Sequence, residues 1–75
     1  MSHEGQDLKL VYMANQIGKF FHSQPHDQAV DGIADHIRKF WDPRMRSKIL
    51  AYVAAGGGGL EPDAREAIER LKDHK

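Results

Sequence analysis

The most distinctive chemistry of the chain lies in residues 40–46, which read Phe-Trp-Asp-Pro-Arg-Met-Arg. Phe40 opens this segment, the only tryptophan, Trp41, follows it, and Arg38, Arg44 and Arg46 surround them with positive charge. Arginine and tryptophan are enriched at the energetic centres of protein interfaces, whereas a basic cluster can also bind phosphates. The segment is therefore a candidate contact site for a protein or a phosphate-bearing ligand. The alternative is that Trp41 fills the core and the arginines cap or pair locally.

Metal and nucleotide chemistry are suggested by the five histidines and by the glycine run at residues 56–59. His22 and His26 are four residues apart, but Pro25 interrupts a common helix face and no further ligand follows at a characteristic spacing. The glycine run lacks the preceding strand and the following Lys-Ser or Lys-Thr of a phosphate loop. Surface or capping histidines and a helix stop are the favoured interpretations, so we expect no metal or cofactor of the chain's own.

Catalysis is disfavoured for a related reason. Acid–base pairs and nucleophile–base pairs act only when they converge in a concave pocket, and the carboxylates here are scattered over the surfaces of predicted helices. We therefore expect a noncatalytic protein with no catalytic residues.

Short helices are expected to position the candidate segment. The residue before a proline is biased away from the helical region, so Asp42 should end one helix and cap the next, giving a corner. The first helix is predicted from Asp7, its N-cap, to about His22. The second is predicted to start in the turn at residues 23–27, with Ser23 as a cap, and to run to about Trp41.

Two more helices follow the corner. The third should end at Gly56, a residue suited to the left-handed C-terminal position, with the next glycines forming a flexible link. The fourth should begin near Pro62. No segment alternates with the period of a strand, so the fold class is all-α, a small bundle of three to four short helices. Residues 1–6 are expected to be a flexible N-terminus, and residues 7–75 a single helical domain.

The first helix has an unusually wide apolar face. Its main stripe, which we expect to be buried, consists of Leu10, Ala14, Ile17 and Phe21. Met13 and Phe20 add a second row beside it. This row either widens the core or contacts another protein, and both residues are therefore candidates for partner binding.

Composition restricts the classes of protein that remain. The chain has 75 residues, no cysteine, and 11 basic against 11 acidic residues, so no global field favours nucleic acid or a membrane. No run approaches the roughly 20 apolar residues of a membrane span, and no secretory signal is visible. We expect a soluble cytoplasmic protein. A core of this size supplies only about 3–5 kcal/mol, so further support would come from a partner or from self-association.

Several segments together resemble the delta subunit of soluble NAD-dependent, molybdenum-containing formate dehydrogenase. They are Leu10-Val11-Tyr12-Met13-Ala14-Asn15-Gln16-Ile17, Gln24-Pro25-His26-Asp27, the run from Gly32 through Arg46, Ala54-Ala55-Gly56-Gly57 and Gly59-Leu60. The resemblance covers nearly the whole chain after the first several residues. It implies an accessory polypeptide of an enzyme that oxidises formate to carbon dioxide and passes the electrons to NAD.

The resemblance also implies where the cofactors lie. The molybdopterin-type cofactor and iron–sulfur clusters belong to the large alpha subunit of that enzyme, with flavin and further clusters on other subunits. The leading hypothesis is thus a noncatalytic subunit that binds the alpha subunit and supports its assembly, cofactor insertion or stability. A protein that holds the phosphates of the molybdenum cofactor during its insertion is the alternative, and a small nucleic-acid binder is a weaker one.

Overall fold

The computed structural model describes the backbone of residues 3–73 and the side chains of residues 7–72, and within these ranges it is built from helices without strands. The helices are α1 (His3–Phe21), α2 (His26–Phe40), α3 (Pro43–Ala54) and α4 (Pro62–Asp73). The predicted all-α fold, a small bundle of up to four short helices, is confirmed.

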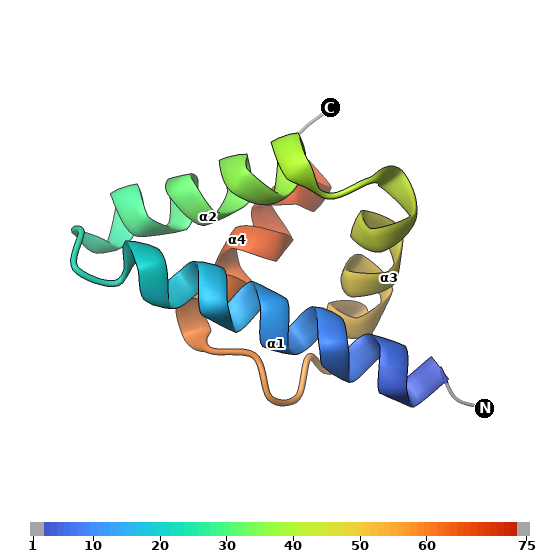
Figure 1. Cartoon of the computed structure of the whole chain (residues 1–75). Coiled ribbons are helices and arrows are strands. Elements are labelled where there is room, and N and C mark those ends of the chain that lie inside the picture. The colour runs from blue at the N-terminus through green and yellow to red at the C-terminus, as the bar shows by residue number, and fades with distance from the viewer. Residues whose placement is uncertain (1–2, 74–75) are drawn as a thin grey trace.

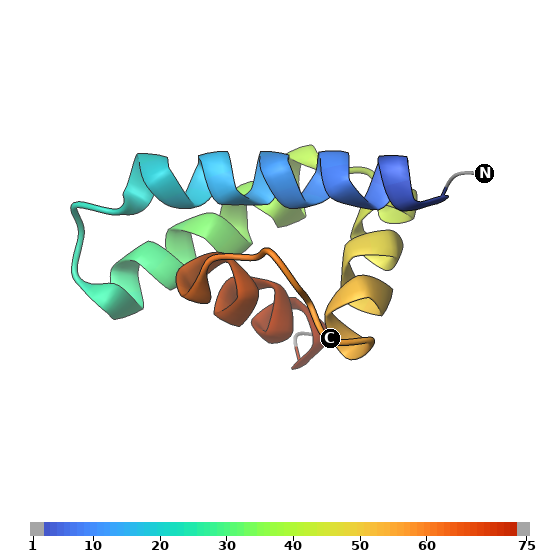
Figure 2. The same ribbon diagram turned by 90° about the horizontal axis from the view of Figure 1, so that it is seen from below.

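The helices are arranged around α1 and α2, which run side by side in opposite directions after a tight turn (Figure 1). The α3 helix stands across one end of this pair, and α4 returns against α2 on the side that Figure 2 shows below α1. Both α1 and α4 contact each of the other helices. The candidate corner lies where α2 gives way to α3.

All four helices contribute side chains to one core. Its fully buried large members are Ile33 and Ile37 of α2, Ile49 of α3 and Ile68 of α4. Alanines fill the places where helices cross: Ala14, Ala34, Ala64 and Ala67 are all buried. Small residues at these positions let the helix axes approach closely, while the isoleucines fill the space between them. The apolar sides of α2 and α4 therefore face the core.

Two predicted N-caps are wrong, although α2 does begin within the predicted turn, at His26. The α1 helix begins at His3, so Asp7 lies inside it instead of capping it. Residues 3–6 include no proline that would stop the helix, and Gly5 costs it only about 1 kcal/mol relative to alanine. Ser23 does not cap α2 either, because α2 has Pro25 at its N-cap position and no side-chain cap there. The flexibility of residues 1–6 stays a prediction, and residues 1–2 lie outside the described range.

Hydrogen bonds fix the connection between α3 and α4. Gly56 has a φ of 134°, and its N–H donates to the backbone carbonyl of Val53. The N–H of Gly57 donates to the backbone carbonyl of Tyr52. These two bonds form the Schellman ending of α3, which confirms the predicted role of Gly56. Further along, the Tyr52 hydroxyl donates to the carbonyl of Gly58. The expected flexible link is thus a turn with an ordered set of backbone contacts.

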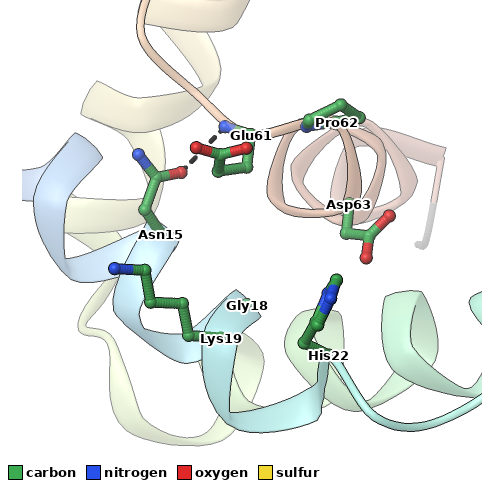
Figure 3. Close-up of a pocket in the computed structure, with 7 residues that line it drawn as sticks. All are labelled: Asn15, Gly18, Lys19, His22, Glu61, Pro62 and Asp63. Atoms are coloured by element: carbon green, nitrogen blue, oxygen red, sulfur yellow. Dashed lines mark hydrogen bonds between the residues drawn. The ribbon is translucent and has the colours of Figure 1, made fainter.

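Asn15 of α1 ties this connection to the rest of the fold. Its amide nitrogen donates to the carbonyl of Gly59 at 2.9 Å, and its amide oxygen accepts from the backbone N–H of Glu61 at 2.8 Å. Both functional groups of the side chain are therefore used to set the start of α4 against α1 (Figure 3).

Candidate docking surface

The corner at residues 40–46 is built largely by its own residues. Trp41 is only 4% exposed and belongs to the core. The Asp42 carboxylate accepts from the N–H of Met45 at 2.8 Å, so the predicted N-cap of α3 is confirmed. Arg46 donates through Nη1 to the carbonyls of Trp41 and Arg38, the latter at 3.2 Å. These are carbonyls at the C-terminal end of α2, where a cation is favourable.

Two of the seven candidate partner-binding residues therefore shape the fold. The burial of Trp41 and the carbonyl contacts of Arg46 match the alternative in which these side chains act locally. A third, Arg38, lies half-buried 3.8 Å from the Asp35 carboxylate, which also pairs with Lys39 at 3.1 Å. Met13 is half-buried and packs against the core, so this part of the second row of α1 widens the core.

Phe40 and Arg44 are the parts of the corner that face solvent. Phe40 is 71% exposed, and its ring lies 4.7 Å from the His36 ring between centroids. Arg44 is exposed in the first turn of α3. The side chains of Phe40 and Arg44 are therefore available to a partner. Arg46 does not join Arg44 there, because its guanidinium turns back to the carbonyls of α2.

A larger exposed apolar surface lies on α1. Leu8, Tyr12 and Phe20 are 60%, 64% and 80% exposed. Leu8 and Tyr12 are four residues apart and Phe20 follows after eight more, so the three side chains project from the solvent side of one helix. We call this surface the α1 outer face and include in it the exposed polar residues between its apolar ones, Lys9, Gln16 and Lys19.

Phe20 is held in place by packing beneath it. Its ring meets the ring of Phe21 edge to face, with centroids 5.2 Å apart. Phe21 in turn lies against Gly32 of α2, where an added Cβ would be only 2.6 Å from the Phe21 ring. The absence of a side chain at Gly32 thus makes room for an aromatic ring of α1. The contact gives Phe20 a preferred position before any partner binds.

A cavity of about 450 Å³ lies between this helix and the beginning of α4 and shares Lys19 with the α1 outer face (Figure 3). It is lined by α1 and the beginning of α4, through Asn15, Gly18, Lys19, His22, Glu61, Pro62 and Asp63. The Asn15 amide is already committed to the backbone of residues 59 and 61. Among the residues that the structure describes, no group of three or more His, Cys, Asp or Glu side chains could hold a metal ion.

A charged cluster joins α2 to α4. The two ring nitrogens of His26 lie 3.2 Å from the Asp63 carboxylate and 2.8 Å from that of Glu66. Arg70 contacts Glu66 at 3.1 Å and also Asp31 at 2.6 Å. The hydrogen bond to Glu66 and its charge raise the pKa of His26 above the ordinary 6.5, with smaller contributions from Asp63 and Asp27 and some opposition from desolvation.

The sequence analysis did not identify Leu8 and Tyr12 of the α1 outer face. Leu8 and Tyr12 carry a usable signal, since their spacing of four places them opposite the buried stripe that includes Ala14. The contact of His26 with Glu66 has no signal in the sequence, because the two residues are 40 positions apart.

By its fold and surface the chain is a small all-α domain with an exposed apolar helix face. No helix in the described part of the chain is long and apolar enough to cross a membrane. The family model of the NADH-dependent formate dehydrogenase delta subunit, FdsD, matches residues 9–68, and the chain belongs to that family. No curated protein and no solved structure matched in the corresponding comparisons.

Proposed function

We propose that this delta subunit is a noncatalytic accessory protein that binds the large, molybdenum-containing subunit of formate dehydrogenase and supports its assembly, cofactor insertion or stability. Family membership supports a place in the formate dehydrogenase complex. The observation that carries the binding role is the α1 outer face, where Leu8, Tyr12 and Phe20 are each at least 60% exposed on one helix. Grouped exposed apolar side chains of this size mark interaction surfaces.

The packing of Phe20 also supports a docking role. A side chain that is ordered in the free protein loses less conformational entropy when a partner covers it. The edge-to-face contact with Phe21 supplies such order for Phe20. Aromatic anchors of this kind dominate the energetics of many interfaces.

The cofactor-handling alternative receives less support from the corner. It relies on Arg44 and Arg46 together as ligands of phosphate groups. Arg46 uses Nη1 for the carbonyls of α2, so Arg44 is the member of the pair that remains directed outward. Membership of the family implies that the cofactors of the enzyme belong to its other subunits, and we propose that this chain has the accessory role and acts in the cytoplasm.

Co-purification tests the proposal. The tagged chain would be expressed from its own locus, captured under gentle conditions, and the yield of the large subunit measured per tagged chain. The double variant Tyr12→Ser/Phe20→Ser should lower this yield by about thirtyfold or more, because loss of central aromatic anchors costs on the order of 2 kcal/mol or more. Gln28→Ser, an exposed position on α2, is the control and should retain the wild-type yield.

Two further measurements complete the test. Circular dichroism should show that the variants keep the wild-type helix content, since exposed substitutions change stability by only about 0.5 kcal/mol. In a strain that lacks the gene, the molybdenum content and formate oxidation of the purified enzyme should fall. Failure of the wild-type chain to recover the large subunit, with unchanged formate oxidation in the deletion strain, would refute the proposal.

A further inference from the structure

Charge is distributed unevenly over this electrically neutral chain. From Leu8 to His22 the sequence holds two lysines and no acidic residue. The α3 helix, which contacts α1, holds three basic residues and again no acidic one. The balance of 11 basic and 11 acidic residues therefore arises because carboxylates are concentrated elsewhere.

Many of those carboxylates are already paired on α2 and α4. Asp31 and Glu66 contact Arg70, and Asp63 contacts His26. By contrast, Lys9 and Lys19 are exposed, and neither forms an ion pair with a described side chain. The α1 outer face thus combines apolar side chains with positive charges that form no ion pair with a described side chain.

We infer that the surface of the large subunit that covers the α1 outer face has an apolar centre bordered by carboxylates. The inference rests on the proposed function and adds the chemistry of the partner surface. The apolar centre would bury Leu8, Tyr12 and Phe20, and the carboxylates would lie opposite Lys9 and Lys19. Complementary charges at the rim of an interface steer association and fix its register.

The test uses the tagged chain co-expressed with the complete enzyme. The complex is captured through the tag and washed with increasing concentrations of sodium chloride, and the large subunit that remains bound is measured at each step. Lys9→Glu and Lys19→Glu should each lower the retained fraction at low salt by about three- to tenfold, since a charge reversal replaces a rim attraction by a repulsion. Lys72→Glu on α4, also exposed, makes the same charge change away from this face and is the matched control.

The outcomes separate this inference from the function on which it rests. Loss of retention in the two α1 variants but not in Lys72→Glu supports the inference, as does stronger retention by the native chain at low salt. If the large subunit is captured but all three variants behave alike, the acidic partner surface is refuted and the proposed function stands. If the native chain captures no large subunit at any salt concentration, both are refuted.

Discussion

Gly18 and Gly32, which both lie inside helices, should respond to alanine in opposite directions. In a helix interior, alanine is favoured over glycine by about 1 kcal/mol. At Gly18 of α1 an added Cβ would meet Ile33 at 3.8 Å and Ala64 at 3.9 Å, which are ordinary contacts. Gly18→Ala should therefore raise the free energy of unfolding by about 0.5–1 kcal/mol.

At Gly32 the same gain in helix propensity is offset by overlap. The added Cβ would lie 2.6 and 2.7 Å from two carbons of the Phe21 ring, so the ring must move. Overpacking of this kind costs about 1–3 kcal/mol, and a displaced Phe21 also loses its edge contact with Phe20, worth about 0.5–1.5 kcal/mol. Gly32→Ala should lower the free energy of unfolding by about 0.5–3.5 kcal/mol after the helix gain is subtracted.

Urea unfolding, followed by the fluorescence of the buried Trp41 and by circular dichroism, measures both changes. Thermal melts should also separate the two variants, because for a domain of this size a change of about 1 kcal/mol in the free energy of unfolding shifts Tm by about 4–8 °C. Combining Gly32→Ala with Phe21→Leu should cost less than the sum of the single changes, because the smaller side chain relieves the overlap. Equal stabilisation by alanine at positions 18 and 32 would refute the packing of Phe21 against α2.

Three further predictions concern polar contacts. Asn15→Ala should lower the free energy of unfolding by about 0.5–1.5 kcal/mol, because the exposed N–H of Glu61 exchanges its Asn15 acceptor for water; urea titration beside Asn15→Asp, which keeps an acceptor, checks this. Arg46→Met should lower the free energy of unfolding by about 1–2 kcal/mol, because carbonyls at the end of α2 lose a donor. Arg44→Met should change it by less than about 0.5 kcal/mol. Equal effects of the two substitutions in thermal melts would contradict this difference. Because the pKa of folded His26 is raised above 6.5, its stabilising contribution should be fully present below pH 6.5 and be lost as pH rises through the folded pKa. The Tm difference between the native chain and His26→Gln, measured from about pH 5 to pH 9, should shrink in that direction, and a difference that grows with pH would overturn the assignment.

Local signals in the sequence were sufficient for the helices and for one cap. Ile33 and Ile37 are four residues apart, which is the helical spacing of their shared buried face, and the Asp-Pro step correctly places Asp42 as the N-cap of α3. Both depend on residues a few positions apart, over which helix periodicity and capping geometry act.

Contacts between distant segments could not be predicted in the same way. Asn15 bonds to the backbone 44 and 46 positions later, and no local pattern specifies that pairing. The same limit applies to the docking residues. The corner held the most distinctive residue types, yet Trp41 is buried there, while the less distinctive Leu8 and Tyr12 are exposed. Composition identified candidates, and only packing decided which of them reach solvent.

The α1 outer face has a consequence for the colloidal behaviour of the purified protein. Copies of a protein are kept apart in part by their shared net charge, and this chain has a pI of about 7.0. Near neutral pH this repulsion between copies is minimal, while the exposed apolar side chains can still associate with those of another copy. Alkaline buffer restores net charge but deprotonates His26, which weakens its contacts with α4. Mildly acidic buffer restores net charge and keeps those contacts, so it should give the most dispersed and most stable preparation.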